Sequence, residues 1–295
     1  MGFRYYLRNA YSDEIELADP YLVQGVDGLG LPPVEYFTRH GVYQTGDTVV
    51  HQRWKARTIS IGVNIVGTSD ATYQAARLAL ASMLKNIGED LFFAIELDGG
   101  VERYMAVRYG GQLTMPTKAK GGVYRTASAF RLTASKPMWY DPTTTIWSYA
   151  LGSGDGTWGY GVGLPEGFGA SVLDVTQVRT YVGTEAVNPK VYVYGPAEDF
   201  LIENETTDEK LDLTGHSIGS TEVVTVDLGY GVKSVESSTD NTELADFLAN
   251  DSDFTFHLAP HPEGLGGSNT MHISFVNGTT STRAEIRFNA QYSAV

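Results

Sequence analysis

Three histidines in the second half of the chain could bring imidazole groups together around a metal ion. Strand-like alternation predicts outward positions for His257 and His272 on two strands, with His261 in the loop between them. Pro260 and Pro262 constrain that loop, and no carboxylate has the spacing that completes a recognised zinc site. We therefore expect surface histidines and no bound metal.

Acidic residues cluster at Glu198-Asp199, Glu203–Glu209 and Asp251–Asp253. A glycosidase needs two carboxyl groups fixed across a cleft, one of them in a desolvating environment. These clusters fall in turn-like segments, where nothing desolvates a carboxyl group. The last cluster could contribute to a calcium site, but it lacks the glycine and the closing glutamate of an EF-hand loop. The clusters indicate solvated loops.

Two short motifs have the letter pattern of an active site. Gly154-Asp-Gly156-Thr-Trp-Gly159 matches a dinucleotide-binding loop, but no strand precedes it and no helix follows it. Ser82 and Lys85 are spaced like a serine–lysine nucleophile pair, without the companion motifs of such enzymes. The chain has no cysteine, which excludes thiolate nucleophiles and disulfides. We expect no catalytic residues, no cofactor and no enzymatic activity.

The first half reads as strands with one helix. Residues 58–66 alternate, with four isoleucine or valine side chains on one side of the strand. Residues 67–70 offer a turn and a helix N-cap, and apolar residues then recur at helical spacing. Further strand patterns cover 91–97, 101–108 and 123–134. These patterns predict a β domain over 1–137 with one inserted α-helix at about 70–87.

The second half is expected to be nearly all β. Strand patterns cover 191–194, 200–203, 211–213, 223–228, 253–258, 270–276 and 284–292. About seven short strands at this spacing predict a two-sheet antiparallel sandwich over 188–295.

The segment 138–187 is rich in glycine and holds Trp139, Trp147 and Trp158. A solvated linker does not hold so many large aromatic residues. We expect an irregular connector that packs on a domain or on a neighbouring subunit and adds strands to the sandwich.

Composition and charge separate the two halves. The 295 residues are 42% hydrophobic, enough for two globular domains. Residues 1–137 hold 15 Lys and Arg against 13 Asp and Glu, a balance of +2, whereas 138–295 hold 6 against 22, a balance of −16. The acidic half repels phosphate backbones. No apolar run is long enough to span a bilayer or to act as a signal peptide before Asn9, so we expect synthesis in a cytoplasm.

An ordered series of short motifs runs through both halves. The first half contains Asp27-Gly-Leu-Gly-Leu-Pro-Pro-Val-Glu35, Gln44-Thr-Gly46, Lys55-Ala-Arg57-Thr-Ile-Ser-Ile61 and the helix with Arg77 and Leu80. The second contains Tyr181-Val-Gly-Thr184, Asn188-Pro-Lys-Val-Tyr-Val-Tyr-Gly195-Pro196, Ile202-Glu-Asn204-Glu-Thr-Thr207, Leu211-Asp-Leu213 and Val226-Asp-Leu228. The order and spacing of this series resemble the phage tail-component family, the distal tail proteins (baseplate hub) of siphophages, over nearly the whole chain.

The resemblance implies a structural virion protein at the tail tip, made in the host cytoplasm. Its N-terminal tail-tube-like β domain would build a homohexameric ring around the channel through which double-stranded DNA passes. Its C-terminal galectin-like β-sandwich would project outward, where receptor-binding proteins or other baseplate proteins attach. The ring would join the tail tube protein above to the tail-associated tip protein below.

Two other functions stay open at this point. The first is a carbohydrate-binding module of the tail that attaches the virion to host surface polysaccharide, with His257, His272, Arg287 and Asn289 on an exposed carbohydrate or partner face. Sugars often stack on tryptophan, and no tryptophan follows Trp158. The second is a cell-wall hydrolase, which lacks any carboxylate pair or triad. The loop 259–269 is longer than the turn typical of the family, and both a partner contact and a tolerated insertion would explain it.

Overall fold

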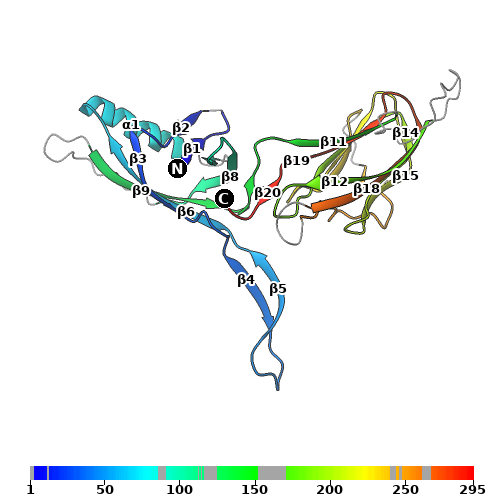
Figure 1. Ribbon diagram of the computed structural model, residues 1–295, viewed down its shortest axis with the longest axis horizontal. Coiled ribbons are helices and arrows are strands. Elements are labelled where there is room, and N and C mark those ends of the chain that lie inside the picture. Colours follow the sequence, from blue (N-terminus) through cyan, green and yellow to red (C-terminus); the bar gives the residue numbers. More distant parts are fainter. Residues whose placement is uncertain are drawn as a thin grey trace. The chain divides into compact units, whose positions relative to one another are not determined.

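The computed structural model describes residues 3–11, 13–85, 91–111, 113, 115, 125–151, 171–239, 244–245, 248–260 and 267–295. The chain divides into two compact units, one of residues 1–142 with 292–295 and the other of residues 143–291. Strands dominate both units, and the described residues contain one α-helix (Figure 1). The predicted fold class, mainly β with one inserted helix, is confirmed.

The first unit is built on a nine-stranded sheet whose main path runs β2-β1-β7-β8-β9-β6-β3. The paired strands of this path are antiparallel. Their bounds are β1 (Arg4–Arg8), β2 (Glu14–Glu16), β3 (Tyr21–Asp27), β6 (Arg57–Val66), β7 (Leu91–Glu96), β8 (Glu102–Tyr109) and β9 (Arg125–Ala134). The short strand β10 (Trp139–Tyr140) joins the same sheet by pairing with β8, and β20 (Gln291–Tyr292) pairs with β10.

Helix α1 (Asp70–Leu84) packs on the buried face of this sheet, in the same core as the inward residues of β6. It begins with a capping box, in which the Ser69 hydroxyl accepts from the Thr72 N–H and the Thr72 hydroxyl accepts from the Ser69 N–H. It ends at Leu84, with Lys85 as the C-cap residue. The predicted helix reached residue 87, but residues 86–90 lie outside the described part of the chain.

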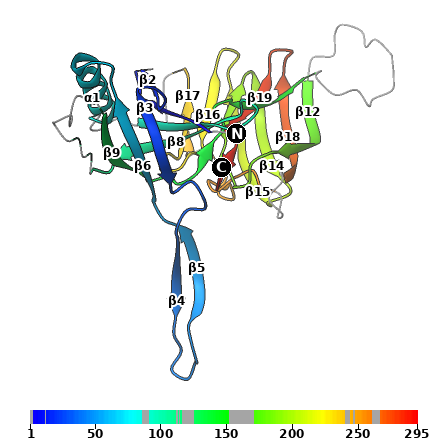
Figure 2. The ribbon, with the colours of Figure 1, turned by 60° about the vertical axis from the view of Figure 1, so that its left-hand side comes forward.

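A long two-stranded hairpin, β4 (Val34–Arg39) and β5 (Thr48–Trp54), belongs to the first unit but not to its sheet. Figures 1 and 2 show it projecting away from β6 and β3. Its two strands pair only with each other among the described strands. The hairpin therefore meets solvent along its length.

The second unit is an antiparallel sandwich of two sheets. One sheet has the order β11 (Thr145–Ala150), β19 (Arg283–Phe288), β13 (Lys190–Tyr194), β16 (Val223–Asp227) and β17 (Ser234–Ser237). We call it the five-stranded sheet. The four-stranded sheet has the order β12 (Ser171–Tyr181), β18 (Gly267–Gly278), β14 (Ala197–Asn204) and β15 (Glu209–Ile218). Alternate residues of both sheets are buried, as a two-sided core requires.

The predicted strand 253–258 is wrong. The carbonyls of residues 254–257 accept hydrogen bonds from side chains, and Leu258 forms an isolated antiparallel bridge with Val187. Asn188 Nδ2 donates to the carbonyls of Thr255 and Phe256, and Lys233 Nζ donates to that of Phe254. The alternation was real because Phe256 and Leu258 are buried, but the segment runs past the core as an irregular chain.

The described part of the segment 138–187 is largely strand rather than irregular. β10 lies in the first unit, with Trp139 fully buried there. β11 and β12 lie in the second unit, with Trp147 in its core. Trp158 and the Gly154–Gly159 motif lie outside the described residues.

Candidate interaction surfaces

The β4–β5 hairpin has two chemically different faces. Its register pairs Val34 with Trp54 and Tyr36 with Gln52, so these four side chains share one face. We call it the apolar hairpin face. Tyr36 is 58% exposed and Trp54 is 36% exposed. Large apolar side chains left in water on a projecting element are typical of an interface.

The opposite face of the hairpin carries charged side chains together with Phe37, and these side chains contact one another. The Arg53 guanidinium donates to the Glu35 carboxylate at 2.6–2.7 Å and lies 5.0 Å from the centre of the Phe37 ring. Lys55 Nζ lies 3.2 Å from the same carboxylate. The hydrogen bonds from Arg53 and Lys55 hold the pKa of Glu35 below its ordinary value. This face is satisfied within the chain, whereas the apolar hairpin face is not.

The tip of the hairpin adds more exposed apolar surface. Val42 is 91% exposed and Tyr43 is fully exposed. The turn that presents them is held by Gln44, whose Nε2 lies 2.5 Å from the Thr48 hydroxyl, and Gly46 adopts a φ of +84°. A defined turn therefore holds an aromatic residue in water.

The base of the hairpin is fixed by a buried arginine at the start of β6. The Arg57 guanidinium donates to the carbonyls of Leu29 at 3.2 Å and Ser293 at 2.6 Å, and it lies 5.6 Å from the centre of the Trp139 ring. The residue is only 1% exposed. Burial lowers the pKa of this guanidinium to about 10, which leaves it charged at neutral pH. Arg57 therefore joins the chain just before the hairpin to the chain just after it.

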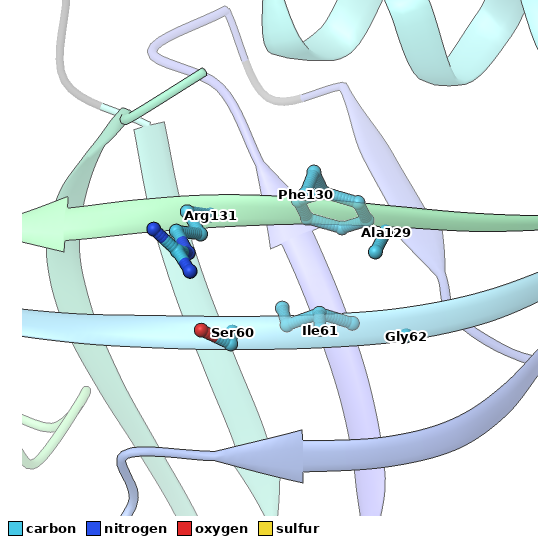
Figure 3. Close-up of a pocket in the computed structure, with 6 residues that line it drawn as sticks. All are labelled: Ser60, Ile61, Gly62, Ala129, Phe130 and Arg131. Carbon is cyan, nitrogen blue, oxygen red and sulfur yellow. The ribbon is translucent and has the colours of Figure 1, made fainter. Parts of the chain in front are cut away.

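A shallow hollow of about 200 Å³ lies on the sheet of the first unit, over β6 and β9 (Figure 3). It is lined by Ser60, Ile61, Gly62, Ala129, Phe130 and Arg131. Ile61 and Phe130 are buried below it, and the small residues Gly62 and Ala129 leave the backbone accessible above. This lining holds no nucleophile with a neighbouring base, so it has no catalytic constellation. It offers a shallow hollow that another backbone can approach.

The predicted carbohydrate or partner residues of the second unit do not form one face. His272 lies on β18 of the four-stranded sheet, and His257 lies in the irregular segment beside β15, with Nδ1 2.8 Å from Glu209. Arg287 lies on β19 of the five-stranded sheet, and Asn289 follows that strand. The outward position predicted for each strand residue is right, but the strands belong to opposite layers. His261 lies outside the described residues.

His272 is held between two carboxylates of neighbouring strands. Its Nε2 lies 2.9 Å from Asp174 of β12, and its Nδ1 lies 3.5 Å from Glu203 of β14. Partial burial alone would lower the pKa of His272, but the hydrogen bonds to the two carboxylates outweigh it and raise that pKa. Within the described residues, no group of three potential ligands has the arrangement of a metal site.

The acidic clusters and the serine–lysine pair take part in ordinary structural contacts. Asp251 forms an ion pair with Lys210, and Glu198 accepts a hydrogen bond from Asn277 at 2.7 Å. The Lys85 N–H donates to the Ser82 carbonyl at the end of α1. Among the described helical residues, no helix is long and apolar enough to cross a membrane.

The five-stranded sheet carries a group of aromatic and charged side chains of which the sequence analysis singled out only Arg287. It consists of the outward residues of two neighbouring strands, Lys190, Tyr192 and Tyr194 of β13 with Arg283, Glu285 and Arg287 of β19. We call this group the tyrosine–arginine face. The signal was present in the sequence as the alternation of Tyr192 and Tyr194 with buried valines, two positions apart on one strand.

Glu285 is the centre of the tyrosine–arginine face. It accepts from Arg283 Nε at 2.8 Å and from Arg287 Nε at 3.0 Å. The two guanidinium groups stack on the tyrosines, with Arg283 3.7 Å from the ring centre of Tyr194 and Arg287 4.3 Å from that of Tyr192. Partial burial raises the pKa of Glu285, but the hydrogen bonds from both arginines outweigh it and lower that pKa. The carboxylate is thus held ionised.

Solved structures show where this fold occurs. No family profile and no curated protein matches the chain. The crystal structure of the Dit protein of phage SPP1, described as a paradigm of the hub adsorption apparatus in phages that infect Gram-positive bacteria, aligns with a TM-score of 0.65. The alignment covers 97% of this chain and 98% of that one, at 13% identity. Chains of the phage P2 baseplate in its activated conformation, with Ca and with Sr, align at TM-scores of 0.52 and 0.51, 9% identity and full coverage of both chains.

The fold is therefore that of phage hub and baseplate proteins. At the level of the fold, the resemblance to siphophage distal tail proteins read from the sequence is confirmed. The likeness extends over both units, since nearly the whole chain aligns.

Proposed function

We propose that this chain is a structural virion protein, the distal tail hub of a siphophage, which works through protein interfaces and not through catalysis. The observation that carries the proposal is the apolar hairpin face, exposed on a projecting arm in a chain with the fold of hub and baseplate proteins. If the protein functions in assembly, another protein covers this exposed apolar face. A catalytic function does not explain why the face is exposed.

The partner of the apolar hairpin face is a second copy of the same chain. In a closed ring of identical subunits, one patch of each copy contacts a different patch of the next. The hairpin supplies the first patch. The shallow hollow over Gly62 and Ala129 is the candidate second patch, because small residues let a neighbouring backbone approach closely. Both patches lie in the first unit, which contains the nearly neutral half of the sequence.

The remaining partners follow from the division of the chain. We propose that the first unit forms a homohexameric ring around a channel for DNA during infection, between the tail tube protein and the tail-associated tip protein. The second unit, acidic and mostly polar on its surface, carries receptor-binding or other baseplate proteins. This assignment places the protein at the tail tip of the virion after synthesis in the host cytoplasm.

Ring formation is tested with the purified full chain by light scattering and negative-stain electron microscopy. Tyr36→Glu and Trp54→Glu place a charge on the apolar hairpin face and are expected to abolish the ring. His51→Gln, on the opposite face of the same hairpin, is the matched control and is expected to keep it. A chain that stays monomeric at high concentration, or a ring that survives both glutamate substitutions, contradicts the proposal.

A further inference from the structure

The four-stranded sheet has two edge strands, β15 and β12, and the loop after β17 covers the first of them. The Lys210 carbonyl accepts from the Asp253 N–H at 2.7 Å, and the Lys210 N–H donates to the Asp253 carboxylate at 3.2 Å. The Asp212 carbonyl accepts from the Ala249 N–H at 2.9 Å, and the Asp212 N–H donates to the Ser252 hydroxyl at 3.0 Å. The chain itself therefore closes the edge of β15.

The other edge strand, β12, pairs with β18 on one side. The direction of its backbone groups follows from Thr270 of β18. The Thr270 N–H donates to the Thr206 hydroxyl at 2.9 Å and its carbonyl accepts from the Glu205 N–H at 2.9 Å, so both groups point away from β12. In an antiparallel pair, two residues directly opposite each other either exchange both hydrogen bonds or both point away. Val178 lies opposite Thr270, so its N–H and carbonyl point toward the free edge of β12.

Alternation extends this result along the strand. The register with β18 is regular from Asp174 onward, so the backbone groups of Asp174, Thr176 and Thr180 also point to the free edge. Within the described part of the chain, no group forms a hydrogen bond with the backbone of these residues at that edge. Figure 2 shows β12 at the rim of its sheet, next to β18. The edge therefore presents a row of unpaired donors and acceptors that repeats about every 7 Å.

The sequence of β12 does not protect this edge. Natural sheets protect a free edge with lysine, proline, bulges or a very short strand. β12 has 11 residues without lysine or proline, and its one irregularity of register lies before Asp174. Its two charged side chains contact the sandwich itself, since Asp174 lies 2.9 Å from His272 and Arg179 lies 5.3 Å from the centre of the Tyr149 ring. A further strand can pair along residues 174–180.

The core beneath β12 is incompletely covered as well. Leu173 and Val175 point inward and yet stay partly exposed, whereas Leu211 and Leu213 on the covered edge strand β15 are buried. On the outer face of β12, Val178 is 65% exposed. A strand added beside β12 would lie about 4.8 Å away and would cover side chains on both faces. Strand addition would thus gain apolar burial together with backbone hydrogen bonds.

Charge selects the partner. The half of the chain that contains this sandwich has a balance of −16, so two copies placed edge to edge repel each other. Paired strands lie about 5 Å apart, which is less than the screening length of about 8 Å at physiological salt. A segment with lysine or arginine is attracted at the same distance.

We propose that the free edge of β12 binds an extended, basic segment of another protein, which joins the four-stranded sheet as a further strand. The inference rests on the proposed function in one respect, namely that the second unit carries a partner protein.

The first measurement needs no partner. Amide hydrogen exchange of the full chain, resolved to single residues, is expected to be fast at Thr176 and Val178. It is expected to be slow at Val175 and Gln177, whose backbone groups point toward β18. Slow exchange at Thr176 and Val178 would show that this edge is already covered and would overturn the inference.

Binding is tested with synthetic peptides of about ten residues, a length that matches the edge. The basic probe alternates lysine with valine and threonine. One control peptide has glutamate in place of each lysine, and a second keeps the lysines but carries N-methyl groups on its interior amides, which removes the donors. By calorimetry, the Kd of the basic probe is expected to lie at least about tenfold below that of either control. The basic probe should also slow the exchange of Thr176 and Val178.

Thr176→Pro removes an N–H that points to the free edge and none that pairs with β18. Proline is tolerated at such positions of edge strands, so the sheet is expected to stay folded while the affinity for the basic probe falls about tenfold. Thr176→Ala keeps the N–H and is the matched control, expected to bind as the wild type does. If Thr176→Pro does not fold, Val178→Lys tests the same edge, because its added charge is expected to weaken the basic probe and strengthen the glutamate probe.

Four outcomes overturn the inference: no binding of the basic probe at millimolar concentration, equal affinity for the lysine and glutamate probes, equal binding of the N-methylated probe, or equal binding by the Thr176→Pro and Thr176→Ala variants. Association of two copies through β12 overturns it as well. Ring formation on the same samples depends on the first unit. An intact ring without peptide binding therefore refutes only this inference, and peptide binding by a chain that forms no ring refutes only the hub proposal.

Discussion

The guanidinium of Arg57 donates to the carbonyl oxygen of Ser293 at 2.6 Å, across 236 positions of the chain. One residue stands at the start of β6, and the other belongs to the four residues, 292–295, that return to the first unit after the whole second unit. The contact closes the first unit over its buried Trp139.

Arg57→Leu is expected to destabilise the first unit by about 2 kcal/mol, because it leaves the partly buried carbonyls of Leu29 and Ser293 without their donor. Thermal and urea unfolding of the full chain measure the loss. Arg131→Leu removes an exposed arginine from the same sheet and should change stability by less than about 0.5 kcal/mol. Equal effects of the two substitutions would show that the Arg57 contacts carry no stability.

The side chain of Asn269, near the start of β18, hydrogen-bonds to the backbone of Ala259. Its side-chain amide accepts from the Ala259 N–H at 2.9 Å and donates to the Ala259 carbonyl at 3.0 Å, and the residue is fully buried. Asn269→Asp keeps the acceptor and removes the donor, so we expect a loss of about 2 kcal/mol. Ser268→Ala changes the exposed neighbour and is expected to be neutral. The free energy of unfolding of both variants is measured in urea. An Asn269→Asp protein as stable as the wild type would show that these hydrogen bonds do not stabilise the fold.

The stability of the second unit is expected to depend on the protonation of His272. Folding raises the pKa of this imidazole, so the folded state binds the proton more tightly than the unfolded chain does. Its stabilisation is complete below the unfolded value of about 6.5 and is lost as pH rises through the folded value. For a partly exposed ion pair we expect about 0.5–1 kcal/mol. The imidazole C–H resonance of His272 is expected to titrate above the ordinary histidine range.

His272→Gln isolates this contribution from the other titrating groups. The stability difference between the wild-type protein and the variant should shrink from about pH 5 to about pH 8. Asp174→Asn removes the closer carboxylate, 2.9 Å from Nε2, and should shift the titration of His272 downward. A titration midpoint at or below the ordinary value in the wild-type protein would refute this account.

The strands that could be predicted from the sequence are those whose alternation coincides with pairing. β6 is an example, because Ile59, Ile61, Val63 and Ile65 face the core while the backbone pairs with β9 along its whole length. The segment 253–258 shows where this reasoning fails. Phe256 and Leu258 also alternate into the core, yet the side chains of Asn188 and Lys233 donate to the carbonyls of residues 254–256. The alternation of apolar residues predicts which side chains are buried, but it does not predict which groups hydrogen-bond to the backbone of the segment.

The candidate surfaces fail to follow from sequence for a related reason. Alternation correctly predicts that His272 and Arg287 point outward, but it does not predict to which of the two sheets each residue belongs. That choice depends on strand partners far away in the sequence, β14 and β12 for one residue and β13 for the other. The hairpin was missed because its apolar residues stay exposed, so its pattern, with Val34 and Tyr36 before a turn at Gly46, does not look like a buried strand.

Because residues 292–295 belong to the first unit, that unit can be completed only after the second unit has been synthesised. A protein chain leaves the ribosome from its N-terminus, and domains generally fold as they emerge. Here Ser293 emerges only after all of residues 143–291. The hydrogen bond from Arg57 to the Ser293 carbonyl can therefore form only after the sandwich has been translated. A chain that ends early within the second unit lacks Ser293, so Arg57 keeps its hydrogen bond to Leu29 but loses the one to the Ser293 carbonyl. Such unfinished chains would therefore be poor building blocks, and assembly would draw on chains translated through both units.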